Sequence, residues 1–199
     1  KVVAWSQTDF CALEQADVSE GDKAPNIVVS FEVFEHVQPA HGRKLLEHML
    51  KVTSADCNYF ISTPCWNGEA AQNHISETTY AALGSLLEDL GFAVTGVWGT
   101  FASIRDYKEQ LSGWTYYYSG NENEPKTCNL LPLFDVLSEY YDTNVLATIF
   151  APLFPAYSRN CLWHVTRSRV GYKRRFSRLV DSPTPWTQHM AWRQLAGGE

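Results

Sequence analysis

A short apolar stretch followed at once by acidic and imidazole side chains constrains this chain more than any other feature. Residues 27–30 (IVVS) follow a Pro-Asn turn signal and predict a buried strand. The next residues include Glu32, Glu35 and His36. In open α/β sheets, ligands bind at the carboxyl ends of the strands. We therefore expect these three side chains to have a chemical role, and their spacing allows them to share one divalent cation.

Composition indicates a globular chain with no membrane contact. With 199 residues and 45% hydrophobic content, one domain with a well-buried core is expected. No segment approaches the ~18 consecutive apolar residues of a membrane span, and no signal peptide is recognisable. The five cysteines are scattered and lack a C-x-x-C pair, which predicts reduced thiols in a cytoplasmic protein. The oligomeric state is left open.

Apolar periodicity predicts alternating strands and helices. We expect strands over residues 11–18 (ending at Asp17), 27–30, 59–62, 92–101 and 160–165. A helix is predicted to open at Pro39, and a second one to start at a Ser76 N-cap and end at Gly91. The alternation predicts an α/β sheet that is parallel in its first half.

The remaining segments predict three regions. Residues 107–158 are rich in aromatic residues and proline, and we interpret them as an insertion that caps the substrate, with one helix near 131–141. Residues 1–106 would then form the core, and 159–199 the last strand and a basic tail. From His164 onward, the sequence contains seven Lys and Arg residues and two acidic residues, although the whole chain carries a net charge of −6. This tail either contacts a polyanion or packs on its own acidic body.

Several of these pieces, in this order, resemble the second half of a class I S-adenosylmethionine-dependent methyltransferase: Asp17, the strand 27–30, the Glu-x-x-Glu-His element, the Ser-Thr-Pro end of the next strand, and His74 before a helix. The resemblance implies a Rossmann-like sheet with adenosylmethionine as cofactor. It also implies that Asp17 accepts a hydrogen bond from the adenine amine and that Ser30 and Phe31 line the cofactor pocket. The alternatives are a turn-capping role for Asp17 and a core role for Phe31.

The Glu-x-x-Glu-His element is similar to that of small-RNA 3′-terminal 2′-O-methyltransferases and of ubiquinone-biosynthesis O-methyltransferases. In the first family, two Glu and two His hold Mg²⁺ or Mn²⁺, and Glu32, Glu35, His36 and His74 occupy the matching positions. The resemblance implies an O-directed, metal-assisted reaction with Glu35 and His36 at its catalytic centre. Many methyltransferases with Glu-His at this position bind no metal, so a purely structural glutamate remains the alternative.

One departure from the family is large. The glycine-rich turn after the first strand and the acidic end of the second strand are both absent from this sequence. We expect either that upstream residues outside this chain supply them, or that cofactor binding has been lost. The first hypothesis is a methyltransferase acting on a nucleic acid, held through the basic tail, or on a small molecule. The alternative is a methyltransferase-like binding or scaffold protein without catalytic turnover.

Overall fold

The computed structural model describes residues 10–12, 14, 23–66, 70–102, 111, 114–117, 125–178 and 190–192. The chain divides into two compact units, Lys1–Val97 with Cys161–Glu199, and Trp98–Asn160. Of the strand expected over residues 11–18, only part is described, and Phe10–Ala12 forms a 3₁₀ helix (η1). Asp17 lies outside the described residues.

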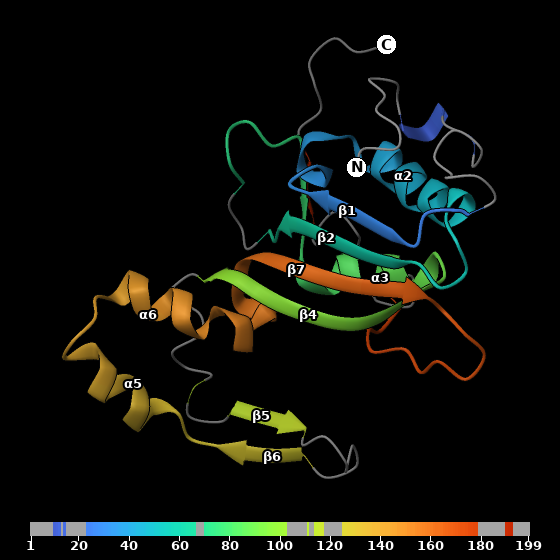
Figure 1. The fold of residues 1–199 in the computed structure, drawn as a ribbon. Coiled ribbons are helices and arrows are strands. Elements are labelled where there is room, and N and C mark those ends of the chain that lie inside the picture. The colour runs from blue at the N-terminus through green and yellow to red at the C-terminus, as the bar shows by residue number, and fades with distance from the viewer. Residues whose placement is uncertain are drawn as a thin grey trace. The chain divides into compact units, whose positions relative to one another are not determined.

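Most of a four-stranded sheet with the order β1-β2-β7-β4 belongs to the first unit (Figure 1). Its strands are β1 (Ile27–Phe31), β2 (Asn58–Pro64), β4 (Phe92–Ala102) and β7 (Ser158–Arg167). β1 and β2 are parallel, which confirms the expectation for the first half of the sheet. The arrows in Figure 1 show that β7 is antiparallel to both of its neighbours, β2 and β4. The result is a mixed α/β sheet.

Two helices cover one face of this sheet. They are α2 (Pro39–Val52) and α3 (Tyr80–Asp89), and the predicted start of the first at Pro39 is confirmed. Leu46 of α2 and Leu87 of α3 join one core cluster with Tyr59 of β2 and Trp163 of β7. All four side chains are at most 1% exposed. Because successive strand residues alternate between faces, every second residue of β2 points into this core.

Residues 27–30 form the predicted strand, but the prediction that this strand is buried is wrong. Ile27, Val29 and Phe31 are 60%, 57% and 52% exposed. In the described part of the chain β1 is the edge strand, and only β2 pairs with it. The side chains of Val28 and Ser30 point to the face of the sheet that the helices cover. Because successive residues alternate between faces, Ile27, Val29 and Phe31 point to the opposite face.

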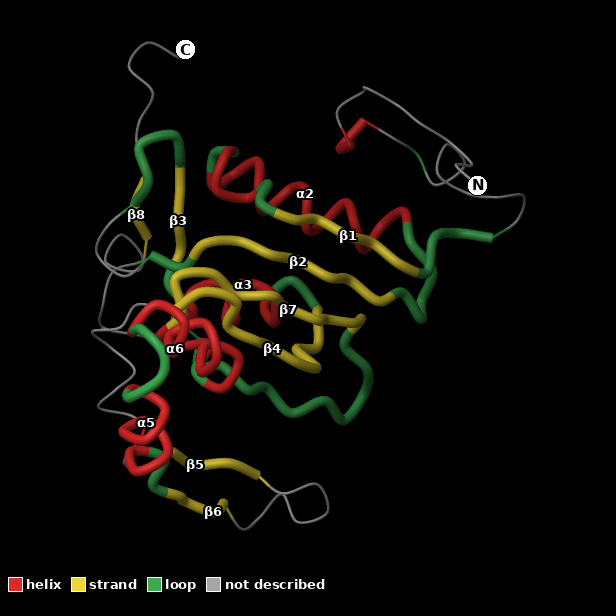
Figure 2. The backbone as a smooth tube through the Cα atoms, turned by 60° about the vertical axis from the view of Figure 1, so that its left-hand side comes forward, coloured by secondary structure: helices red, strands yellow, loops and turns green. Residues whose placement is uncertain are grey.

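The predicted N-cap of α3 is also wrong. Ser76 belongs to a short strand, β3 (Ser76–Thr78), which pairs antiparallel with β8 (Met190–Trp192). Figure 2 shows the two strands next to each other. Thr79 caps the helix instead, because its side chain accepts a hydrogen bond from the Ala82 N–H at 3.2 Å. The predicted helix end is confirmed, since Gly91 follows the last turn with φ +98°.

The second unit has its own core. It contains the antiparallel pair β5 (Trp114–Tyr117) and β6 (Pro125–Cys128), the helices α5 (Leu131–Ser138) and α6 (Thr143–Phe150), and two 3₁₀ turns, η3 (Ala151–Leu153) and η4 (Pro155–Tyr157). We expected one helix near 131–141, but the Asp142 carboxylate caps a second helix at the Asn144 and Val145 N–H groups. No helix in the described ranges is long and apolar enough to cross a membrane.

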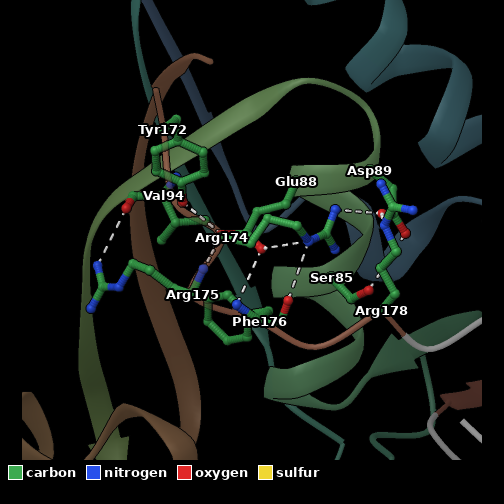
Figure 3. A network of polar contacts seen from close by, with 9 residues as sticks. All are labelled: Ser85, Glu88, Asp89, Val94, Tyr172, Arg174, Arg175, Phe176 and Arg178. Atoms are coloured by element: carbon green, nitrogen blue, oxygen red, sulfur yellow. Dashed lines mark hydrogen bonds and ion pairs between the residues drawn. The ribbon is translucent and has the colours of Figure 1, made fainter. Parts of the chain in front are cut away.

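The segment after β7 is fastened to α3 through a buried carboxylate (Figure 3). Glu88 accepts hydrogen bonds from the Tyr172 hydroxyl and from the backbone N–H groups of Arg175 and Phe176. Arg174 forms ion pairs with Glu88 and Asp89. Part of the basic tail therefore neutralises acidic groups of its own unit.

Candidate functional site

The candidate site begins where β1 ends. Glu32 follows the strand with φ +53°, and among the described residues it is the one non-glycine residue with a positive φ. Its N–H still donates to the Ser62 carbonyl on β2 at 3.0 Å, and its carboxylate accepts a 2.6 Å hydrogen bond from the Ser62 hydroxyl. This left-handed step turns the chain from the strand into the 3₁₀ helix η2 (Phe34–His36).

Glu35 is the buried carboxylate of the site. Its side chain is 1% exposed, and the Thr63 hydroxyl of β2 donates to it at 3.3 Å. Burial raises the pKa of Glu35 more than the hydrogen bond from its own backbone N–H lowers it, and the Glu32 carboxylate raises it further. A buried carboxylate of this kind is stabilised by positive charge.

His36 is the accessible member of the site. Its side chain is 44% exposed, and its Nε2 lies 3.8 Å from Glu35 Oε1. Its Nδ1 lies 3.2 Å from the Asn73 carbonyl oxygen. Because a carbonyl oxygen only accepts hydrogen bonds, this contact assigns the hydrogen to Nδ1 and leaves the Nε2 lone pair free in the neutral ring.

His74 arrives on a loop that is fastened to η2. The Ile75 N–H donates to the Glu35 carbonyl at 2.7 Å, and the Ser76 hydroxyl donates to the Val37 carbonyl at 3.0 Å. His74 is 15% exposed, and its Nδ1 contacts Oε1 of Glu77. An ionised carboxylate is also acceptor-only, so His74 carries its hydrogen on Nδ1 as well.

The structure brings three of the predicted ligands together. Glu35, His36 and His74 each offer one ligand atom, and these atoms all lie within 4.8 Å of one another. With both Nδ1 atoms occupied by oxygen acceptors, the Nε2 atom carries the lone pair in each neutral ring, and that of His36 lies 3.8 Å from Glu35 Oε1. Two imidazoles and one carboxylate suit a divalent ion such as Mn²⁺ or Zn²⁺ better than Mg²⁺, which prefers oxygen ligands. The chemistry of the donor set therefore fits Mn²⁺, one of the two metals that the sequence resemblance implies.

The other predicted site residues do not belong to this cluster of three ligand atoms. Glu32 is not one of these three clustered groups, because its carboxylate is directed to Ser62, but its charge acts on Glu35. Ser30, buried, and Phe31, exposed, form the carboxyl end of β1 directly before the site. Asp17, the predicted adenine contact, lies outside the described residues.

Sequence analysis missed two residues that hold the histidines. Asn73 acts through its backbone carbonyl, for which the sequence carries no signal. Glu77 directly follows Ser76, the residue that was expected to cap a helix, and was therefore expected in the first turn of that helix. Its spacing of three residues after His74 is compatible with a carboxylate–histidine pair, but the irregular loop between them could not be predicted from periodicity.

No model of a known protein family matches this sequence, and no curated protein matches it either. Solved structures that resemble it include the 1,6-didemethyltoxoflavin-N1-methyltransferase of Burkholderia thailandensis with bound S-adenosylhomocysteine (10% identity, 82% of this chain, 50% of that chain, TM-score 0.43). Another is the StiE O-MT (10% identity, 83% of this chain, 50% of that chain, TM-score 0.41). A third is the [4+2]-cyclase SpnF (11% identity, 83% of this chain, 56% of that chain, TM-score 0.39). This chain spans about half the length of these structures.

Proposed function

We propose that this chain carries the catalytic side of an adenosylmethionine-dependent methyltransferase of the Rossmann-like class I fold. In this proposal Glu35, His36 and His74 bind a divalent cation beside the acceptor. The observation that carries the proposal is the convergence of these three side chains at the carboxyl ends of β1 and β2. Ligand sites of open α/β sheets lie at these strand ends.

The arrangement supports an O-directed transfer. A divalent cation held here would lower the pKa of a coordinated acceptor hydroxyl and hold that oxygen for attack on the methyl group. Glu35 is buried and fixed by Thr63, so it contributes a stationary negative charge. His36 is the exposed member of the three, so an incoming acceptor would approach the cation from its side. Without a cation, the Nε2 atom of His36 would be free to accept the proton of the hydroxyl.

The remaining predicted residues belong to the same proposal. Glu32 would complete the ligand set in exchange for its hydrogen bond to Ser62. Ser30 and Phe31, adjacent to the ligands in sequence, would line the cofactor pocket, and Asp17 would contact the adenine. The acceptor is a nucleic acid, contacted by the basic tail, or a small hydroxyl compound.

Metal binding is tested first, on the 199-residue chain without cofactor. Titration with Mn²⁺, followed by electron paramagnetic resonance, should show one site. Glu35→Gln, His36→Ala and His74→Ala should each abolish it, and Glu32→Gln should weaken it less. His41→Ala, at the start of α2 and outside the cluster, is the matched control. Binding that survives all three cluster substitutions would contradict the proposal.

Methyl transfer is tested with a radiolabelled methyl donor. Calorimetry with S-adenosylhomocysteine measures cofactor binding separately. A single-stranded RNA oligonucleotide with an intact 3′-terminal diol is the first acceptor, and the same oligonucleotide after periodate oxidation is its control. Transfer to the intact form that is lost with EDTA supports metal assistance. Cofactor binding without transfer to any hydroxyl acceptor would favour the binding or scaffold function instead.

A further inference from the structure

We propose that Glu77 is the positioning residue of this site, which holds His74 in the tautomer whose Nε2 can bind a cation. The proposal rests on the proposed metal site and adds a residue to it that ligates nothing itself. Its observation is the contact between Glu77 Oε1 and His74 Nδ1.

Burial makes the pairing of Glu77 consequential. The Glu77 side chain is 5% exposed, so its carboxylate has little access to water. Besides His74, the same oxygen accepts a hydrogen bond from the Ala71 N–H at 3.3 Å. Burying a carboxylate costs free energy unless hydrogen-bond donors replace the lost water. When there are few donors, each must be well directed, and a strong N–H donor reduces the cost most. The imidazole N–H of His74 supplies that donor.

The backbone of Glu77 is fixed from two sides. As the middle residue of β3, it lies opposite Ala191 of β8. One residue later, Thr78 forms a bridge with Cys65, and its carbonyl accepts the Trp66 N–H at 3.0 Å. The carboxylate is therefore held by a small sheet, whereas His74 lies on the loop before it. Glu77 is the rigid partner, and His74 is the group being oriented.

Fixing the tautomer has a direct consequence for metal binding. A histidine binds a cation through the nitrogen that carries no hydrogen, and a carboxylate on the other nitrogen sets which one this is and strengthens the ligand. Among the described residues, Glu77 is the one acceptor that contacts His74 Nδ1, so without it the hydrogen is no longer held on that nitrogen. The Nε2 atom would then carry the hydrogen for part of the time and could not bind a cation in that form.

The first experiment needs no metal. Long-range ¹H–¹⁵N spectra of the histidine rings, with His74 assigned by His74→Ala, report the tautomer of the neutral ring. In the wild-type chain His74 should be protonated at Nδ1. Glu77→Ala should shift it toward the Nε2-protonated form, and Glu77→Gln, whose amide oxygen still accepts, should shift it less. Glu47→Ala, on the exposed surface of α2, should change nothing. An unchanged tautomer in a folded Glu77→Ala chain overturns the proposal.

The second experiment measures Mn²⁺ affinity. Glu77→Ala should weaken binding by about 10–100-fold, the usual effect of removing a carboxylate behind a ligating histidine. If Glu77→Ala does not fold, Glu77→Gln serves, with an expected loss of about tenfold or less. Affinity within twofold of wild type in both variants overturns the role of Glu77. If the wild-type chain binds no Mn²⁺, the proposed function fails, while the tautomer measurement still decides whether Glu77 positions His74.

Discussion

The imidazole rings of His36 and His74 lie edge to face, with their centroids 5.1 Å apart and their planes at 85°. One ring belongs to η2 and the other to the loop before β3, so the pair exists only because the two segments are fastened together. The hydrogen bonds between the two segments include those from the Ile75 N–H to the Glu35 carbonyl and from the Ser76 hydroxyl to the Val37 carbonyl. The geometry of the site therefore depends on groups that ligate nothing.

Replacing Ser76 by alanine tests this dependence. The variant loses a buried hydroxyl that donates to the Val37 carbonyl, which should cost about 1 kcal/mol of stability. Because the loop then docks less firmly, Mn²⁺ affinity should fall as well. Chemical denaturation and metal titration measure the two effects. Ser54→Ala removes a hydroxyl that bonds to Asp56 on the surface and should alter neither. Equal metal affinity in both variants would show that the docking is not needed.

We expect the chain to lose stability at alkaline pH because the pKa of Tyr172 is raised in the folded state. Its pKa is raised to about 12, chiefly by burial and then by its hydrogen bond to Glu88. The folded state therefore holds the proton above the unfolded-state pKa of about 10. The contribution is complete below pH 10 and is lost as the pH rises toward 12. Denaturant unfolding between pH 8 and 12 should show the decline.

The matched variant is Tyr172→Phe. It should be less stable by about 1–2 kcal/mol at neutral pH, because Glu88 and the Val94 N–H each lose a hydrogen-bond partner. Its decline above pH 10 should be shallower but present, since burial also raises the pKa of Tyr80 to about 12. Tyr140→Phe, at a side chain that is 75% exposed, is the control. An unchanged alkaline slope in Tyr172→Phe would remove this interpretation.

The elements that the sequence predicted well are those with a strong local signal. Pro39 starts a helix because its φ suits the first helical turn, and Gly91 ends one because it adopts a left-handed conformation at little cost. Errors arose where local signals were ambiguous. Ser76 and Thr79 are both good caps, and only the pairing of β3 with β8 decides between them. The exposure of β1 follows from the order of strands, which no local pattern encodes.

The candidate site divides in the same way. The position of Glu35 and His36 near the carboxyl end of a strand could be predicted, because both residues closely follow the apolar stretch 27–30. His74 was placed by the family resemblance, not by physical reasoning, because its approach depends on a backbone hydrogen bond of Ile75. The role of Glu77 emerges only in three dimensions, since its partner lies within an irregular loop.

The cysteines should divide into two reactivity classes. None of the five forms a disulfide bond in the structure, and Cys57, Cys65 and Cys161 are buried. Burial raises the pKa of Cys57, and the adjacent Cys65 together with burial raises that of Cys161. Since the thiolate is the reactive form, the raised pKa slows the reaction of Cys57 and Cys161. Burial shields all three side chains, so each should react slowly with a thiol reagent in the native state.

Timed labelling with Ellman's reagent and peptide mass spectrometry checks this division. Cys11 and Cys128, which are partly exposed, should react first, and the other three only after denaturation. Cys128→Ser should remove one fast equivalent and leave the slow phase unchanged. Rapid native labelling of Cys161 would show that the core around β7 opens more readily than its burial indicates.

Gly84 predicts the largest steric effect in the core of the first unit. A Cβ at this position would overlap the ring of Phe176, which packs on α3 from the segment after β7. Gly84→Ala should therefore destabilise the chain by about 1–3 kcal/mol, even though alanine is the better helix former. Gly42 is the matched control, because a Cβ in α2 would meet the Phe34 ring at an ordinary 3.4 Å. Gly42→Ala should be neutral or stabilising by up to about 1 kcal/mol.

The mechanism is checked by a double variant. Phe176→Leu removes the ring edge that the new methyl group meets, so Gly84→Ala should cost less in that background than in the wild type. The difference between the two costs is the coupling free energy, measured by denaturant unfolding of all four chains. Additive effects would mean that the overlap is not the cause. In that case the loss would have to come from another neighbour of α3, and the close packing of Phe176 against Gly84 would be contradicted.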